Sequence, residues 1–186
     1  LFGKGNVRSN WGLYSWQGVS PKTESLAYEK PIEIPYSQRS KIIKKAAEFF
    51  GADLVGITKI EPEFLYTAEY DTETGEHRKL FVPENCKTVI VMAVQMDYDS
   101  MRSSPDILAG AATGFGYSKM AFLTFQVSQF LRHLGYTAIP NGNDTALSIP
   151  LAIKAGLGEL GRNGLLITKK YGPRVRICKV ITDMEL

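Results

Sequence analysis

Ten residues in the second half of the chain, 155–164, are rich in glycine. The segment reads Ala-Gly-Leu-Gly-Glu-Leu-Gly-Arg-Asn-Gly and holds four glycines. Because glycine has no Cβ, such a stretch lets backbone N–H groups approach a large ligand closely. It lacks the Gly-Lys-Ser/Thr ending of a Walker loop, and a helix rather than a strand is expected before it, unlike the dinucleotide-binding GxGxxG pattern. From its chemistry alone, the segment is either a cofactor cradle or a turn-rich connector.

Three other residues could take part in acid–base chemistry. Tyr117 follows a run of small residues at the expected start of a helix, and that end of a helix stabilises negative charge, so a tyrosine there could release its proton. Arg176 lies mid-strand, with Arg174 and Cys178 expected on the same side, and an inward-facing arginine would need an anionic partner such as a tyrosinate. Asn143 lies in a Gly/Asn turn, where asparagine is common for backbone reasons. A surface or core tyrosine and an outward-facing arginine stay open as simpler interpretations.

The composition limits the class of protein. The chain has 186 residues, 44% of them hydrophobic and 22% charged, with a net charge of +3, which allows one domain with a core. The basic residues are scattered, so nucleic-acid binding is not implied, and no apolar run reaches the roughly 20 residues of a membrane helix. Cys86 and Cys178 are too few for an iron–sulfur cluster, which takes about four thiolates; a disulfide between them is a minor alternative. His77 and His133 are too few for a zinc site.

Hydrophobic periodicity predicts a mixed α/β domain around one sheet, without internal repeats. Residues 1–36 show no period and are predicted to form an irregular arm that contains Trp11, Tyr14 and Trp16. The continuous apolar run within residues 87–96 predicts a strand buried on both faces. The other predicted elements are helices over 37–50, 118–134 and 148–155, strands over 53–58, 136–139, 165–168 and 174–181, and loops over 61–83 and 97–116.

Several stretches resemble the respiratory reductive dehalogenases. They are Phe-Gly-Tyr-Ser at 115–118, Asn-Asp-Thr-Ala-Leu-Ser-Ile-Pro at 143–150, Ala-Gly-Leu-Gly at 155–158, Arg-Val-Arg-Ile-Cys at 174–178 and Thr-Asp-Met at 182–184. The resemblance covers residues 37–186. Its Ala-Gly-Leu-Gly part is shared with epoxyqueuosine reductases, whereas the second and last of these stretches are typical of the dehalogenases.

The resemblance implies a fold similar to the flavin nitroreductases, with a base-off corrinoid of the cobalamin type in place of flavin. It implies that Tyr117 donates a proton, that Arg176 is the basic residue beside it and that Asn143 helps to position the substrate. Cofactor contacts are implied for Thr113, Gly114, Tyr117, Gly156, Leu157, Gly158 and Glu159. Two 4Fe–4S clusters are implied in a following cysteine-rich segment, so we expect this chain to be part of a longer protein and to be inactive alone.

The implied reaction is reductive dehalogenation, R–X + 2 e⁻ + H⁺ → R–H + X⁻, with Co(I) supplying the electrons and Tyr117 the proton. The family further implies a halogenated substrate such as a chlorinated ethene, a small membrane-anchor protein, a homodimer as one assembly, and export by the twin-arginine route to the outer face of the cytoplasmic membrane. Three alternatives stay open. One is a corrinoid-binding or trafficking module without catalysis, and another is a flavin nitroreductase relative, which would usually bind its phosphate with basic residues and dimerise extensively. The third is an epoxyqueuosine-reductase-like enzyme, although those enzymes carry an aspartate where this chain has Tyr117.

Overall fold

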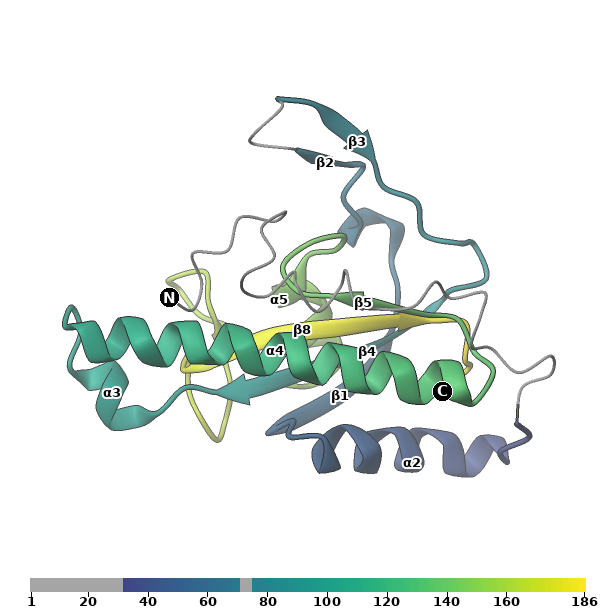
Figure 1. Ribbon diagram of the computed structural model, residues 1–186, viewed down its shortest axis with the longest axis horizontal. Helices are drawn as coiled ribbons and strands as arrows, with labels where there is room; N and C mark the ends of the chain where they lie inside the picture. Colours follow the sequence, from purple (N-terminus) through teal and green to yellow (C-terminus); the bar gives the residue numbers. More distant parts are fainter. Residues whose placement is uncertain (1–31, 71–74) are drawn as a thin grey trace.

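A four-stranded antiparallel sheet organises the protein, as the computed structural model shows (Figure 1). The structure describes residues 32–70 and 75–186, so nearly all of the predicted arm over 1–36, including its aromatic residues, lies outside the described residues. The strand order is β1-β4-β8-β5, which runs from β1 (Leu54–Lys59) through β4 (Thr88–Gln95) and β8 (Val175–Thr182) to β5 (Ala138–Asn141). The predicted mixed α/β class is confirmed; its assignment to the nitroreductase type stays a prediction.

Strand β4 is the centre of the core. Each of its residues except Gln95 is buried, and it is hydrogen-bonded to β1 on one side and to β8 on the other. A strand buried on both faces has no solvent-facing side to alternate with, which explains the unbroken apolar run. The prediction of a central strand over residues 87–96 is therefore confirmed to within one residue at each end.

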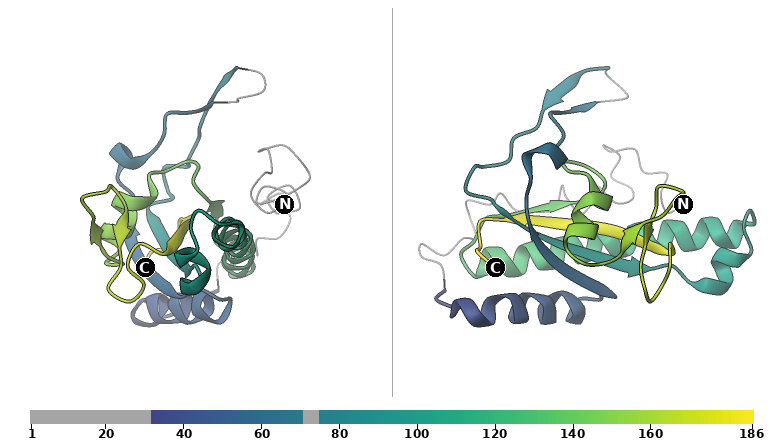
Figure 2. Two further views of the ribbon diagram at one scale, coloured as in Figure 1. Left: turned by 90° about the vertical axis from the view of Figure 1, so that its left-hand side faces the viewer. Right: turned by 180° about the vertical axis from the view of Figure 1, so that it is seen from behind.

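Helices cover both faces of the sheet. Helices α2 (Tyr36–Phe49) and α4 (Ile107–His133) lie on one face and α5 (Ser148–Lys154) on the other (Figures 1 and 2). Because successive residues of a strand point to opposite faces, β4 contributes to two separate clusters of core residues. Its side chains on the α4 face are Ile90, Met92 and Val94, and those on the α5 face are Val89, Val91 and Ala93.

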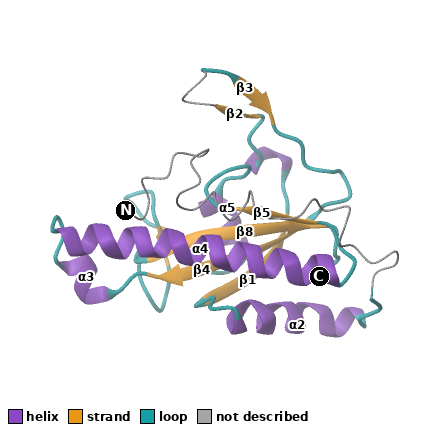
Figure 3. Ribbon diagram, viewed as in Figure 1, coloured by secondary structure: helices purple, strands orange, loops and turns teal. Residues whose placement is uncertain are grey.

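The first half of α4 corrects the sequence analysis. Residues 97–116 are predicted as a loop, but they contain α3 (Tyr98–Arg102), and α4 already begins at Ile107 (Figure 3). The small residues at 109–114 have no apolar period, which hides the helix; alanine is nevertheless the best helix former, and packing on the sheet offsets the cost of about 1 kcal/mol for each glycine. The Asp106 carboxylate accepts a hydrogen bond from the Ile107 backbone N–H at 2.6 Å and so caps the helix.

A short hairpin gives a predicted strand its partner. The predicted strand over residues 165–168 is confirmed as β7 (Leu166–Ile167), which pairs with β6 (Glu159–Leu160). The glycine-rich segment therefore contains β6 and most of the turn of this hairpin, on the α5 face. A second hairpin and one helical turn interrupt the loop over 61–83: η2 (Pro62–Phe64), β2 (Ala68–Tyr70) and β3 (His77–Lys79).

The two cysteines do not form a disulfide. Cys86 and Cys178 are free and buried, and they belong to the clusters of core residues on opposite faces of the sheet. The predicted helices over 37–50 and 148–155 are confirmed as α2 and α5. Within the described part of the chain, no helix combines the length and the apolar character that crossing a membrane requires.

Candidate functional site

Tyr117 and Arg176 lie against each other on the α4 face of the sheet. Tyr117 comes from α4, and Arg176 comes from β8, opposite Val94 of β4. The Arg176 Nη1 donates a hydrogen bond to the Tyr117 hydroxyl oxygen at 3.2 Å, and the guanidinium carbon lies 4.4 Å from the centre of the Tyr117 ring. A cation so placed is attracted both to the oxygen and to the π-face of the ring. The fold thus joins two residues that are 59 positions apart in the sequence.

Asn143 approaches the same oxygen from the loop between β5 and α5. Its side-chain Nδ2 donates to the Tyr117 hydroxyl oxygen at 3.4 Å, and the residue is exposed. A phenolic oxygen has two acceptor lone pairs and one proton, so donors from Arg176 and Asn143 occupy the lone pairs and the proton points toward a third partner. This arrangement suits a general acid, because both donors also stabilise the phenolate that remains after proton transfer.

The position of Tyr117 overturns the electrostatic argument made from the sequence. Tyr117 lies in the middle of α4, which begins at Ile107, and the field of a helix end falls off within the first turn. The prediction that the helix N-terminus stabilises a tyrosinate at Tyr117 is therefore wrong. The error follows from the prediction of a loop over residues 97–116. Positive charge comes from the Arg176 guanidinium instead.

A pocket of about 200 Å³ opens beside two of these three residues, and Tyr117 is not part of its lining. Arg176 and Asn143 line it, together with Leu165, which directly follows the glycine-rich segment. The Arg176 Nε is buried and has no hydrogen-bond partner within residues 32–70 and 75–186. A buried donor without a partner costs about 1–3 kcal/mol, so the packing around this atom leaves one donor of Arg176 unsatisfied. The other lining residues are Ser148, Ile149, Leu166, Pro173, Val175 and Ile177.

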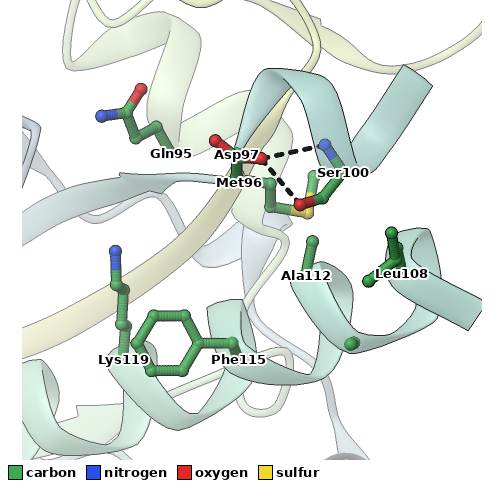
Figure 4. Close-up of a pocket in the computed structure, with 9 residues that line it drawn as sticks. Gln95, Met96, Asp97, Ser100, Leu108, Ala112, Phe115 and Lys119 are labelled. Carbon is green, nitrogen blue, oxygen red and sulfur yellow. Dashed lines mark hydrogen bonds between the residues drawn. The ribbon is translucent and has the colours of Figure 1, made fainter. Parts of the chain in front are cut away.

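Thr113 and Gly114 lie one turn before Tyr117 on α4. Gly114 is buried, and the Thr113 hydroxyl lies 4.0 Å from the sulfur of Met96 and 3.9 Å from that of Met101. Met96 also lines a larger pocket of about 410 Å³, between the end of β4, α3 and the outer face of α4 (Figure 4). Its other lining residues are Gln95, Asp97, Ser100, Leu108, Ala111, Ala112, Phe115 and Lys119.

The start of the glycine-rich segment lies on the other face of the sheet from Tyr117. Leu157 belongs to the cluster of core residues beneath α5, and Glu159 begins the exposed strand β6. A Cβ at Gly158 would lie 2.3 Å from a backbone oxygen of β7, and Gly156 has a φ of +77°, which favours glycine. Close packing and a turn thus explain these two glycines. The structure does not bring residues 156–159 together with Tyr117, and their contact with a cofactor stays a prediction.

Two glycines of α4 allow a matched test of how closely Arg176 packs. A methyl group at Gly116 would lie 2.9 Å from the Arg176 Cγ, whereas one at Gly110 would meet nothing within 4 Å. We expect Gly110→Ala to raise the free energy of unfolding by about 0.5–1 kcal/mol through helix propensity. We expect Gly116→Ala to lower it by about 1–3 kcal/mol through overpacking. Urea unfolding of the two variants measures both values, and equal effects would contradict the contact.

Lys179 is a buried lysine that sequence reasoning missed. Its side chain points from β8 to the α5 face, is fully buried, and donates hydrogen bonds from Nζ to the Gly142 backbone oxygen at 2.7 Å and to the Ser148 hydroxyl at 2.9 Å. Burial lowers the pKa of Lys179 to about 8, against the opposing effect of Asp144. The only sequence signal is a lysine between apolar strand residues, a pattern that half-exposed strands share.

The burial of Lys179 makes the stability of the fold depend on pH. Between the folded pKa of about 8 and the ordinary value of 10.5, the unfolded chain binds a proton that the folded chain has lost. The Lys179 contribution to the free energy of unfolding therefore rises with pH in that window, by at most about 1.4 kcal/mol per unit. Cys178, whose pKa burial raises from 9.0 to about 12, acts in the opposite direction above pH 9.0.

A variant isolates this effect from that of Cys178. We expect the stability of Lys179→Met relative to the unmodified protein to be highest at neutral pH, because methionine removes the cost of a buried charge there but leaves the Gly142 oxygen without its donor at every pH. This relative stability should fall as the pH rises through the window between about 8 and 10.5. Urea unfolding of both proteins across the window measures it, and a difference that stays constant would contradict the assignment.

Comparison with known proteins gives a consistent set of relatives, although no protein-family model matches the chain. The tetrachloroethene reductive dehalogenase of Desulfitobacterium hafniense is 38% identical over 210 residues, which cover 94% of this chain and 38% of the relative. The enzyme of the same name from Sulfurospirillum multivorans is 33% identical over 207 residues, which cover 98% of this chain and 40% of the relative. The chain therefore spans less than half the length of these relatives.

Solved structures show the same fold. A catabolic reductive dehalogenase superposes with a TM-score of 0.77 at 23% identity, over 92% of this chain and 25% of that one. An epoxyqueuosine reductase from Streptococcus thermophilus superposes less closely, with a TM-score of 0.53 at 19% identity, over 80% of this chain and 47% of that one. The chain is thus a homologue of the tetrachloroethene reductive dehalogenases along 94% of its residues, and the resemblance inferred from its sequence is confirmed.

Proposed function

We propose that the chain is the corrinoid-binding catalytic part of a reductive dehalogenase, which replaces the halogen of an organic compound by hydrogen. The overall change is R–X + 2 e⁻ + H⁺ → R–H + X⁻. The observation that carries the proposal is the convergence of Arg176 and Asn143 on the Tyr117 hydroxyl at the edge of a pocket. It occurs in a chain that is 38% identical to tetrachloroethene reductive dehalogenases.

Tyr117 acts as the general acid in this proposal. Its proton points away from the two donors and transfers to the substrate carbon as the carbon–halogen bond breaks. The remaining phenolate keeps its hydrogen bonds from Arg176 and Asn143, which strengthen because the acceptor is now charged. A proton from solvent then restores the phenol for the next turnover.

The corrinoid, when bound, supplies the two electrons of the reaction. The described residues fit one wall of its site rather than an enclosing cavity, because the pocket at Arg176 measures about 200 Å³ and even drug-sized ligands take about 300–1,000 Å³. Arg176 and Asn143 supply the polar side chains of that wall. We assign corrinoid contacts first to residues 113–117 of α4, and we propose that Leu165, which directly follows the glycine-rich segment, adds a contact from the pocket at Arg176.

The resemblance supports further proposals for the complete protein. We propose that the corrinoid is bound base-off, and that two 4Fe–4S clusters in the part of the relatives that this chain does not span deliver its electrons. The substrate is a halogenated organic compound such as a chlorinated ethene. A small membrane-anchor protein would hold the enzyme at the outer face of the cytoplasmic membrane, and a homodimer is one assembly to test.

A cofactor-exchange experiment tests the proposed function. The full-length protein is refolded with cobalamin or with flavin mononucleotide, and absorption spectra and chloride release from tetrachloroethene are recorded with a chemical reductant. We expect a bound corrinoid and corrinoid-dependent chloride release. Flavin binding without corrinoid binding would contradict the proposal. Corrinoid binding without release of halide from any of a panel of aliphatic and aromatic halides would favour a trafficking module instead.

A further inference from the structure

The loop that carries Asn143 is held from inside the protein by Lys179. The Lys179 Nζ donates to the Gly142 backbone oxygen at 2.7 Å and to the Ser148 hydroxyl at 2.9 Å, and these two residues lie on either side of Asn143 in the sequence. Lys179 is fully buried and points to the α5 face of the sheet, whereas Arg176 lies on the α4 face. The two cations of β8 therefore act on the Asn143 loop and on Tyr117 from opposite faces of the sheet.

The same loop is strained and pinned at further points. Thr145 has a φ of +64°, a left-handed conformation that costs a non-glycine residue about 1–3 kcal/mol and persists only where its surroundings enforce it. The Asp144 carboxylate accepts a hydrogen bond from the Gly142 N–H at 2.7 Å. The Tyr66 N–H donates to the Thr145 oxygen at 2.9 Å, and the Leu147 N–H donates to a backbone oxygen of η2 at 2.8 Å. The loop therefore has one enforced shape.

A fully buried lysine is energetically unfavourable compared with an apolar core residue. An apolar side chain of similar length would avoid the cost of removing a charge from water, and replacing buried charges by apolar residues is often neutral or stabilising. An apolar side chain could not donate a hydrogen bond to the Gly142 backbone oxygen, which would then lose its donor. This hydrogen bond is therefore the contribution of Lys179 that an apolar core residue could not replace.

The geometry at Asn143 is sensitive to such a loss. Its amide reaches the Tyr117 oxygen at 3.4 Å, which is at the long end of hydrogen bonds. A loop displacement of a fraction of an ångström away from Tyr117 would break this contact. We propose that Lys179 is a positioning residue, which holds the Gly142 oxygen so that the Asn143 amide reaches Tyr117. The catalytic part of this inference rests on the proposed dehalogenase function.

The first arm of the test needs no enzyme activity. Hydrogen–deuterium exchange of the full-length protein is compared for the unmodified form, Lys179→Met and the control Lys44→Met, which removes an exposed lysine from α2. In Lys179→Met, we expect the amides of Gly142, Ala146 and Leu147 to exchange about tenfold faster or more, as the loss of about 1.4 kcal/mol of local stability would give. Unchanged exchange in this loop would overturn the proposal that Lys179 holds the loop, even in a protein that releases no halide.

The second arm is a double-mutant cycle with Asn143. The variants Lys179→Met, Asn143→Ala and the double variant are assayed in the full-length enzyme for kcat, KM and corrinoid content. We expect each single variant to lose about tenfold in kcat/KM, as for one hydrogen bond of about 1.4 kcal/mol, and the double variant to lose no more than Asn143→Ala alone. Multiplied losses would indicate a merely structural lysine and overturn the inference.

A milder variant keeps the test decisive where Lys179→Met does not fold. Ser148→Ala removes one acceptor of Lys179 and leaves the lysine in place. We expect faster exchange in the same loop and a loss of activity that vanishes in the Asn143→Ala background. The absence of both effects would overturn the inference. Absence of halide release from the unmodified enzyme would count against the proposed function. The hydrogen–deuterium exchange measurement would still decide whether Lys179 holds the loop.

Discussion

Tyr117→Phe is expected to abolish most dehalogenation by the full-length enzyme while leaving its corrinoid content unchanged. The substitution keeps the ring that lies 4.4 Å from the Arg176 guanidinium and removes only the hydroxyl. General acid catalysis contributes about 10²–10⁴-fold to a rate, so kcat should fall by a factor in that range. Chloride release with a chemical reductant measures the loss, and the absorption spectrum of the corrinoid measures its content.

A second tyrosine provides the matched control. Tyr136 packs against the same cluster of core residues as Tyr117 and is not one of the three residues that meet at the Tyr117 hydroxyl oxygen. Tyr136→Phe should keep kcat within about twofold, as surface and near-surface substitutions away from functional groups usually do. Full activity in Tyr117→Phe would remove Tyr117 from the mechanism.

Arg176→Leu should reduce kcat by a factor similar to that of Tyr117→Phe. The phenolate left after proton transfer would lose the charged donor at 3.2 Å and the cation over its ring, and a buried charge without its partner is strongly unfavourable. Arg176→Lys should lose less, because lysine keeps the charge but lacks the planar fork of donors. The assay is again kcat at constant corrinoid content.

Another arginine–tyrosine pair serves as the control for Arg176→Leu. Arg102 of α3 lies over the Tyr98 ring at 5.6 Å, so Arg102→Leu removes a comparable cation–π contact away from Tyr117. We expect this control to leave kcat nearly unchanged. An Arg176→Leu enzyme with the kcat of the unmodified protein would show that the cation beside Tyr117 has no part in proton transfer.

Long periodic elements could be predicted from the sequence, and elements made of small residues could not. Strand β4 is evident because burial on both faces leaves one continuous apolar run. The first turns of α4 contain mostly alanine, glycine and threonine, so they show no apolar stripe, and glycine favours a loop in any local reasoning. Packing of α4 on the sheet decides its length, and that packing is a property of the whole fold.

The residues of the candidate site also differ in whether the sequence could identify them. Tyr117, Arg176 and Asn143 were identifiable only through the resemblance, because each residue alone also fits an ordinary structural role. Their meeting at one oxygen depends on tertiary contacts between α4, β8 and the β5–α5 loop. Lys179 was not identifiable, since its burial depends on a loop that folds over it.

The stoichiometry of a single reaction tests the central proposal most directly. The full-length protein, reconstituted with corrinoid and reduced, is given tetrachloroethene in deuterated water, and chloride and trichloroethene are quantified. Reductive dehalogenation predicts one chloride and one deuterium atom in the product for every two electrons consumed, and none of these without corrinoid. Absence of chloride release, or release at the same rate without corrinoid, would contradict the proposed function.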